Sequence, residues 1–191
     1  IFAVGSDGYI WKSTNQAESF TVLNAGAATT EDLYDVVFYD NNVGYAVGDN
    51  NIVVITEDGG DSWALATGPA AAINLRHVAV NDKGHVFTGG NDGILYRSAD
   101  EATSWATWEN LGGGTITWIE FDEESQFVGM MAHNTPAGMG YLYRSEDGGA
   151  TWYRVENMPT NLGINGGHMC DHNNGFVVGD VQGGTTFIAK F

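Results

Sequence analysis

The chain repeats itself about every 43 residues, and this repeat constrains the fold more than any other feature of the sequence. Four related stretches each join a hydroxyl residue to a terminal aromatic residue: KSTNQAESF (12–20), ITEDGGDSW (55–63), RSADEATSW (97–105) and RSEDGGATW (144–152). Their hydroxyl residues are separated by 43, 42 and 47 positions. A period of roughly 20 to 50 residues indicates a solenoid, a propeller or another repeat array.

A second shared phrase leads into each of these stretches: FAVGSDGYIWKS (2–13), YAVGDNNIVVIT (45–56), FTGGNDGILYRS (87–98) and, with an insertion, FVGMMAHNTPAGMGYLYRS (127–145). A fifth copy, FVVGDVQGGTTFIAKF (176–191), closes the chain without a box. Short runs of Val, Ile, Tyr, Phe and Thr bounded by Gly, Asn and Asp are typical of β-strands joined by tight turns. One unit holds four such runs, for example at 33–40, 44–49, 51–56 and 62–67. A four-stranded unit repeated at this period predicts a β-propeller blade.

The sequence therefore predicts a single all-β domain over residues 1–191, a β-propeller of about five four-stranded antiparallel blades. The predicted repeats cover about 1–31, 32–73, 74–114, 115–165 and 166–191. We expect the first blade to lack its inner strand and the last to lack its outer strand. Because the chain starts with Ile1 inside a repeat, we expect an excerpt of a longer chain; a fragment of a larger propeller is the alternative. Further residues, an oligomer or a larger assembly would then complete the terminal blades.

The eight-residue stretches resemble the Asp-box, Ser/Thr-x-Asp-x-Gly-x-x-Trp/Phe, of bacterial neuraminidase repeat propellers. The same box occurs in sortilin-type receptors, some xyloglucan-cleaving hydrolases and photosystem II assembly-factor propellers. Two copies are complete: Thr56, Asp58, Gly60 and Trp63, and Ser145, Asp147, Gly149 and Trp152. The third copy, Ser98, Asp100 and Trp105, has Ala102 in place of the glycine. The first copy, Ser13 and Phe20, has Asn15 in place of the aspartate and Ala17 in place of the glycine. The resemblance implies a box at the periphery, on the turn between third and fourth strands, away from the ligand face.

The residue types in the box favour a structural role. A short carboxylate accepts hydrogen bonds from N–H groups of its own turn, and glycine adopts a positive φ without strain. The Trp buries apolar surface worth about 2–3 kcal/mol. The alternative is a calcium loop, but that site also needs a bidentate Glu farther along the chain. We therefore predict a hairpin brace and no metal site, and no cofactor is implied.

The composition restricts the partners. Twenty-four acidic residues against seven basic ones give a formal charge of −17, which opposes binding to nucleic acid or to anionic lipid. No apolar run approaches the roughly 20 residues of a membrane span, so we expect no membrane insertion. The single cysteine, Cys170, is expected to be buried. We expect an extracellular, cell-envelope or virion-surface protein.

Candidate binding residues lie on the predicted inner strands, which line the channel of a propeller. Aligning these strands places Tyr34-Asp35, Arg76-His77, Thr117-Trp118 and Gly167-His168 at corresponding positions, with Glu120 two residues after Trp118. Such a ring could bind a sugar or a peptide; alternatively, these side chains satisfy one another within the blade packing. Two longer loops, AHNTPAGMG (132–140) with His133 and DVQGG (180–184), form a second candidate contact region.

The sequence offers few residues in the patterns that catalytic sites of this kind of protein require. Sialidases with this box use three arginines around a carboxylate, whereas only Arg76 of the four arginines falls near the predicted channel. A glycosidase needs two facing carboxyl groups, for which Asp35 and Glu120 are the only inner-strand candidates. The box-bearing xyloglucan hydrolases use much longer, paired propellers. In the assembly-factor propellers the partner-binding face is basic, whereas this chain is acidic.

These observations predict a non-catalytic binding or assembly module, a protein-interaction or adhesion domain with a protein or glycan partner. The alternative is a carbohydrate-binding or glycoside-hydrolase-like propeller that acts at the channel face. The channel-face candidates for either function are Tyr34, Asp35, Arg76, His77, Trp118, Glu120, His133 and His168.

Overall fold

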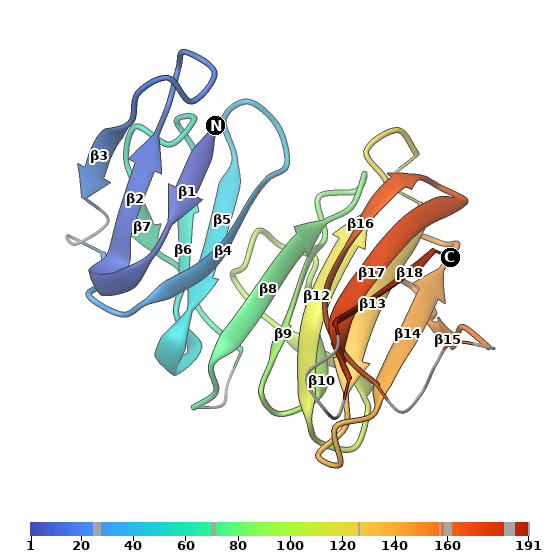
Figure 1. Ribbon diagram of the computed structural model, residues 1–191. Helices are drawn as coiled ribbons and strands as arrows, with labels where there is room; N and C mark the ends of the chain where they lie inside the picture. The colour runs from blue at the N-terminus through green and yellow to red at the C-terminus, as the bar shows by residue number, and fades with distance from the viewer. Residues whose placement is uncertain are drawn as a thin grey trace.

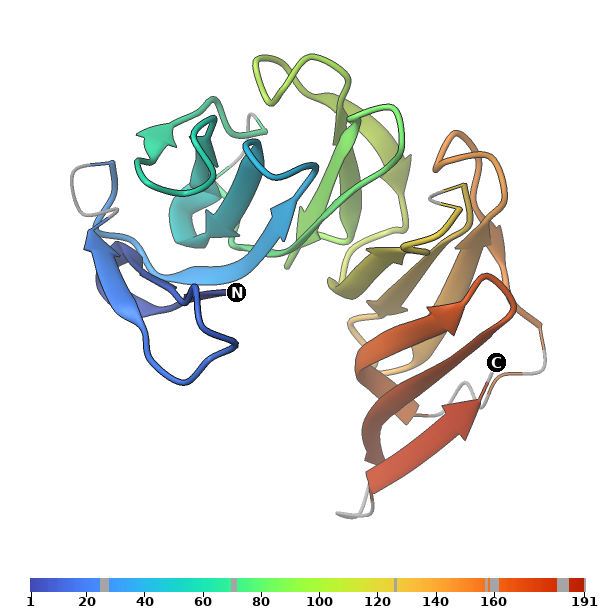
Figure 2. The ribbon, with the colours of Figure 1, turned by 90° about the horizontal axis from the view of Figure 1, so that it is seen from above.

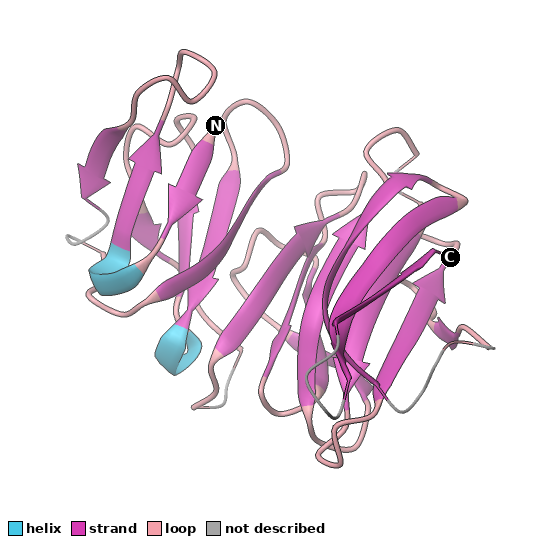
Figure 3. Cartoon of the chain, viewed as in Figure 1, coloured by secondary structure: helices cyan, strands magenta, loops and turns pink. Residues whose placement is uncertain are grey.

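Five antiparallel sheets, each built from consecutive strands, dominate the computed structural model (Figures 1 and 3). The structure describes residues 1–24, 28–69, 72–125, 127–156, 158, 162–181 and 186–190. We call the sheets blades 1 to 5 in chain order. The three-stranded blades lie at the two ends of the chain: blade 1 contains β1 (Phe2–Val4), β2 (Tyr9–Lys12) and β3 (Thr21–Asn24), and blade 5 contains β16 (Leu162–Asp171), β17 (Asn174–Val181) and β18 (Thr186–Lys190). Blade 2 contains β4 (Leu33–Phe38), β5 (Gly44–Gly48), β6 (Val53–Thr56) and β7 (Ala64–Leu65), and blade 3 contains β8 (Leu75–Val80), β9 (Val86–Gly90), β10 (Ile94–Ser98) and β11 (Ala106–Asn110). Blade 4 contains β12 (Thr115–Phe121), β13 (Gly129–Asn134), β14 (Gly140–Ser145) and β15 (Tyr153–Arg154).

The described blades match the predicted propeller, including its two incomplete ends. A short 3₁₀ turn, η1 (Ser6–Gly8), joins β1 to β2, and a matching turn, η3 (Asp49–Asn51), joins β5 to β6. The strand β1 is therefore equivalent to β5, the second strand of its blade, and blade 1 has no described inner strand. Blade 5 has an inner strand, β16, but no described outer strand. The predicted fold class is confirmed; the predicted repeat boundaries stay a prediction.

The blades follow one another along an arc, as Figure 2 shows from above. The inner strands β4, β8, β12 and β16 line the concave side of this arc, and blades 1 and 5 lie at its two ends. None of the helical segments in the described residues could span a bilayer by length and apolar character.

The apolar core lies between neighbouring blades. Between blades 2 and 3, Tyr45 and Val47 of β5 pack in one cluster with Leu75 of β8. Corresponding clusters join blades 1 and 2, blades 3 and 4, and blades 4 and 5. A sheet buries both faces only by stacking on two neighbours, so this contact has to recur along the arc.

Each box closes its turn with the same set of hydrogen bonds. In the second box the Thr56 hydroxyl donates to Asp58 Oδ1 at 2.8 Å and accepts the Gly60 N–H at 2.8 Å. Asp58 accepts the Ser62 N–H at 2.9 Å and the Ser62 hydroxyl at 2.6 Å. These bonds from Ser62 hold the pKa of Asp58 well below its usual range. The bonds all lie within seven residues, so the box stabilises its own hairpin.

The two divergent boxes keep this geometry. In the third box, Ser98 donates to Asp100 at 2.7 Å, as Ser145 does to Asp147 at 2.8 Å in the fourth. In the first box Asn15 Oδ1 takes the place of the carboxylate oxygen and accepts the Ser13 hydroxyl at 2.9 Å and the Ser19 N–H at 3.0 Å. The Asn15 amide instead donates to the Ser19 hydroxyl at 2.9 Å. A neutral amide therefore reproduces the brace with one bond reversed.

The glycine of the box also makes room for the preceding blade. A Cβ at Gly60 would clash with the ring of Phe2, and one at Gly149 would clash with the ring of Phe87. In the third box this position is Ala102, which is buried with φ 60° beside Tyr45 in the core. Close approach between blades explains the glycine as much as its positive φ does.

The terminal aromatic residue of the box packs at the same junction. Trp63 lies edge-on to Phe2 and Phe38, with ring centroids 6.4 and 6.0 Å away. Trp152 packs in the same way against the rings of Phe87 and Phe121. The Trp105 indole N–H donates to the Thr67 carbonyl of blade 2 at 2.7 Å. Phe20, in blade 1 at the end of the arc, is 43% exposed.

The prediction that Cys170 is buried is wrong. Cys170 follows the buried Met169 on β16 and is the extra residue of a bulge between Met169 and Asp171. Its side chain is exposed, and the thiol is free.

We expect Asp58→Ala to lower the thermal unfolding midpoint by several degrees, because Thr56 and Ser62 lose their shared acceptor. Asp58→Asn should cost less, since Asn15 already fills this role in the first box. The folded-state pKa of Asp58 is depressed, so its contribution is present above the unfolded pKa of about 3.9 and is lost as pH falls below it. Asp58→Asn should therefore show a smaller loss of midpoint than wild type between about pH 5 and 2. Equal midpoints for Asp58→Ala and wild type at pH 7 would contradict the brace.

Glu101→Gly should increase the free energy of unfolding. Glu101 has φ 56° at the place where the second box has Gly59, and this conformation costs an L-residue about 1–2 kcal/mol. Glycine removes that strain but is more flexible when unfolded, so we expect a net gain of about 1 kcal/mol in urea unfolding. Glu57→Gly is the matched control: Glu57 is exposed on the second box without a positive φ, and its replacement should destabilise.

Candidate functional site: the channel face

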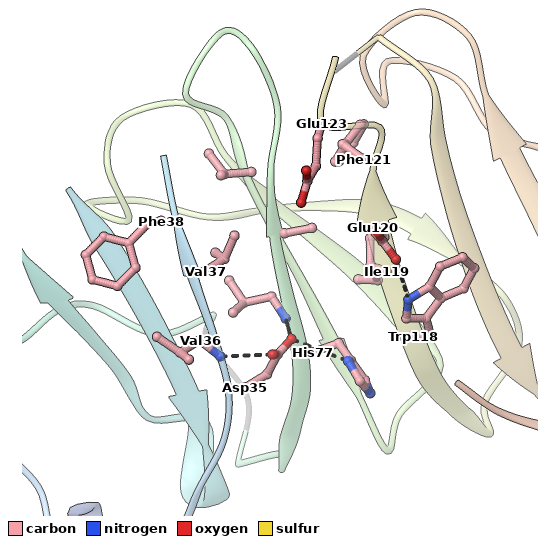
Figure 4. Close-up of a pocket in the computed structure, with 13 residues that line it drawn as sticks. Asp35, Val36, Val37, Phe38, His77, Trp118, Ile119, Glu120, Phe121 and Glu123 are labelled. Atoms are coloured by element: carbon pink, nitrogen blue, oxygen red, sulfur yellow. Dashed lines mark hydrogen bonds and ion pairs between the residues drawn. The ribbon is translucent and has the colours of Figure 1, made fainter. Parts of the chain in front are cut away.

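A cavity of about 530 Å³ opens on the concave side of the arc, across the inner strands of blades 2, 3 and 4 (Figure 4). It is lined by Asp35, Val36, Val37, Phe38, His77, Val78, Ala79, Val80, Trp118, Ile119, Glu120, Phe121 and Glu123. Four of the predicted channel-face residues, Asp35, His77, Trp118 and Glu120, thus meet at one site. We call this cavity the channel groove.

Asp35 ties blade 2 to blade 3 at one end of the groove. Its Oδ1 accepts the N–H of Val36 on its own strand at 2.9 Å. Its Oδ2 accepts the N–H of Val78 on β8 at 2.9 Å and lies 3.4 Å from His77 Nδ1. The carboxylate therefore satisfies backbone donors on the inner edges of two neighbouring strands.

Glu120 makes the same kind of connection between blades 4 and 5. Its Oε1 lies 3.1 Å from His168 Nδ1, while its Oε2 accepts the Trp118 indole N–H at 3.2 Å and the Met169 N–H at 3.3 Å. Burial raises the pKa of Glu120, and the nearby His168 opposes this shift only in part.

The two acid–histidine pairs have the same geometry. The Glu120–His168 pair lies two residues farther along the inner strands than the Asp35–His77 pair. Each carboxylate pairs with a histidine at its own level on the next blade and accepts the N–H of the following residue. Strand register aligns four inner-strand positions: Asp35, His77, Trp118 and Gly166. His168 is therefore level with Glu120, and the predicted alignment of His168 with His77 is wrong by two residues. An equivalent bulge precedes the aligned position in all four strands, and in β16 it lies between Ile164 and Gly166.

Trp118 is mostly covered. Its side chain is 6% exposed, and a Cβ on Gly167 of blade 5 would clash with its ring. The indole N–H is bonded to Glu120. Trp118 thus packs between blades 4 and 5 and offers little ring surface on which a sugar could stack.

Tyr34 and Arg76 lie outside the groove lining, at the bulges that begin β4 and β8. The Arg76 guanidinium stacks on the Tyr34 ring at 4.0 Å from the centroid. The Tyr34 hydroxyl donates to Asp49 Oδ2 at 2.8 Å, a bond that raises the pKa of Tyr34. Arg76 is therefore held as a link between two blades.

His133 is not a loop residue as predicted. It lies in β13, is 1% exposed, and its Nε2 is 2.7 Å from the Gly113 carbonyl. A carbonyl oxygen can only accept, so Nε2–H donates this bond, and burial lowers the pKa of His133. The expected long loop shrinks to residues 135–139, and most of its predicted companion, 180–184, lies outside the described residues.

Sequence reasoning missed a recurring turn after the inner strands. Asp40, Asn81, Asp122 and Asp171 each accept two backbone N–H groups from the next residues of that turn. Asn81 is an amide where the others are acids, and its Nδ2 donates to the Gly148 carbonyl of the fourth box at 2.6 Å. Aligning the repeats at this turn would have revealed the pattern.

Glu123 is the other residue missed, and it lies in the turn after Asp122. Its side chain is exposed, and Figure 4 shows its carboxylate directed into the channel groove. Within the described part of the chain this carboxylate has no hydrogen bond or ion pair. A single free acid in a polar turn carries no signal in one sequence.

The site geometry is better suited to binding than to acid–base catalysis. Both carboxylate oxygens of Asp35 and of Glu120 already contact groups of the inner strands. A glycosidase instead needs one carboxyl group to protonate the leaving group and a second to attack the sugar or to activate a water molecule. No group of three or more His, Cys, Asp or Glu in the described residues could hold a metal ion.

Comparison with known proteins places these features in a family. The family model described as photosynthesis system II assembly factor YCF48 matches residues 12–152. A curated xyloglucanase from a Paenibacillus species is 30% identical over 141 residues, which is 58% of this chain and 14% of that protein. The chain thus spans about one seventh of that relative.

Solved structures share the fold. YCF48 from Cyanidioschyzon merolae superposes with a TM-score of 0.69 at 17% identity, covering 100% of this chain and 65% of that one. The GH74 xyloglucanase of Xanthomonas campestris gives 0.73 at 17% identity, covering 98% and 34%. A structure of YCF48 bound to a D1 peptide gives 0.54 at 16% identity, covering 100% and 88%.

We expect Glu120→Gln to raise the thermal unfolding midpoint at pH 8. The folded-state pKa of Glu120 is raised, so folding becomes less favourable as pH rises through the unfolded and then the folded pKa. Glutamine is neutral throughout and keeps an acceptor for Trp118 and Met169, so its advantage should disappear near pH 4. Glu123→Gln serves as the control and should leave the midpoint unchanged at both pH values. A lower midpoint for Glu120→Gln at pH 8 would show that the His168 pair outweighs burial.

Proposed function

The chain belongs to the photosynthesis system II assembly factor YCF48 family, and we propose that it is a non-catalytic protein-interaction module whose channel groove receives an extended segment of a partner protein. The observation that carries this proposal is the groove itself: a cavity across three blades in which the two inner-strand carboxylates are already bonded. The YCF48 structure with a D1 peptide supports a polypeptide ligand for this fold.

Backbone groups on the groove wall suit an extended segment. In an antiparallel ladder alternate residues direct both N–H and C=O away from the paired strand. Val78 directs its N–H towards Asp35 on the inner edge, so Val80, two residues on, presents its N–H and C=O on the same edge. A peptide in the groove can pair with this edge, as in other strand-addition interfaces.

Glycan binding is the second candidate, because the sequence matches part of a xyloglucanase. The buried ring of Trp118 and the bonded carboxylates give it less support. The predicted extracellular, envelope or virion-surface location belongs to this proposal and rests on composition alone.

A peptide array tests the proposal. We expect the protein to bind members of an array of random 12-residue peptides, and the bound peptide to shift the amide resonances of Val37, Val78 and Ile119 in the ¹⁵N-labelled protein. Glu123→Trp places an indole at the mouth of the groove and should weaken binding about tenfold or more. Glu18→Trp, at an equally exposed site on the first box, should not.

Two results would overturn the proposal. One is peptide binding whose resonance shifts are confined to the boxes at the periphery. The other is binding or cleavage of xyloglucan oligosaccharides by a protein that binds no peptide on the array.

A further inference from the structure

The channel groove has an apolar floor. Its lining includes Val37, Ala79, Val80 and Ile119 from three adjacent strands. Ala79 stands where the other inner strands carry Val37, Glu120 and His168, so blade 3 has the smallest side chain at this level. Ala79 and Ile119 pack with Phe87 in the core between blades 3 and 4, so a ligand side chain would lie over them and not between the blades.

The charged groups of the groove are unbalanced. Three carboxylates line it, Asp35, Glu120 and Glu123, and the lining contains neither lysine nor arginine. Asp35 and Glu120 are bonded to histidines and backbone N–H groups, which leaves Glu123 as the acid available to a ligand. In Figure 4 Glu123 lies at the opposite end of the groove from the Asp35–His77 pair.

An apolar floor that leads to one free carboxylate fits a long side chain with a cation at its tip. Lys and Arg bury an aliphatic stem along apolar surface while the charged end keeps a polar partner. A metal ion would lack ligands, since no set of three acids or histidines converges in the described residues. A sugar would need several unsatisfied donors and acceptors, whereas those of Asp35 and Glu120 are in use. The net charge of −17 also attracts a basic segment from a distance.

We propose that the partner segment is basic, and that one of its lysine or arginine side chains enters the channel groove across Val37, Ala79 and Ile119 to pair with Glu123. This inference rests on the proposed function and specifies its ligand. The Glu123 carboxylate is a specificity group, while the apolar floor and the strand edges hold the rest of the segment.

Three labelled 11-residue peptide mixtures test the inference by fluorescence polarisation. Each has five random positions on either side of a fixed central residue, which is Lys, Met or Glu. Because Glu123 is exposed, its ion pair is screened by water, and we expect the Lys mixture to bind about three- to fivefold more tightly than the Met mixture. Raising the salt concentration should reduce this preference.

Variants at Glu123 separate charge from shape. Glu123→Gln should bring the Lys and Met mixtures within about twofold of each other, and Glu123→Lys should reverse the preference towards the Glu mixture. Glu18→Gln and Glu18→Lys make the same charge changes on an exposed turn of the first box and should leave the preference intact. Unchanged unfolding midpoints would show that the Glu123 variants are folded.

The outcomes distinguish this inference from the proposed function. If all three mixtures bind equally and still shift the resonances of Val37, Val78 and Ile119, the groove binds peptides but the basic anchor is wrong. A Lys preference that survives Glu123→Gln would also overturn the anchor. Failure of every mixture to perturb the inner strands would overturn both.

Discussion

Contact between one blade and the next is the constraint on which the rest of this structure depends. A four-stranded sheet cannot bury both faces alone, so each must place its side chains against a neighbour. At the periphery this requires a ring to lie where a Cβ would otherwise be, as Phe2 does on Gly60 and Phe87 on Gly149. The Asp-box holds its turn in the shape that permits this approach, which links a local hydrogen-bond pattern to the packing of the whole arc.

The same constraint explains where the acidic residues are used. The box carboxylates close peripheral hairpins, and the acids that follow the inner strands close a second set of turns. Asp35 and Glu120 occupy the inner edges and satisfy N–H groups of the adjacent blade. An inner strand edge would otherwise present unpaired donors to the channel. Many acids that resemble catalytic or metal-binding groups in the sequence are therefore bonded within the fold.

The repeat made most of the fold predictable, because hydroxyl, acid and aromatic residues recur in a fixed order with strand-forming runs between them. Register within the inner strands was not predictable, since a β-bulge adds a residue without a distinct sequence pattern. The inner strands share one bulge and β16 has a second, between Met169 and Asp171, and in these ladders His168 is level with Glu120 instead of His77. His133 was assigned to a loop because Gly and Pro follow it, although β13 extends through it to Asn134.

The groove crosses the inner strands of blades 2, 3 and 4, and this connects its structure to the proposed function. Acid–histidine pairs join blades 2 and 3 and blades 4 and 5, whereas the described residues form no such pair between blades 3 and 4, where Ala79 packs in the apolar core. The turn after Asp122 brings Glu123 over this cavity. In the proposed function the braced inner strands supply rigidity around the groove, and Glu123 supplies the specificity.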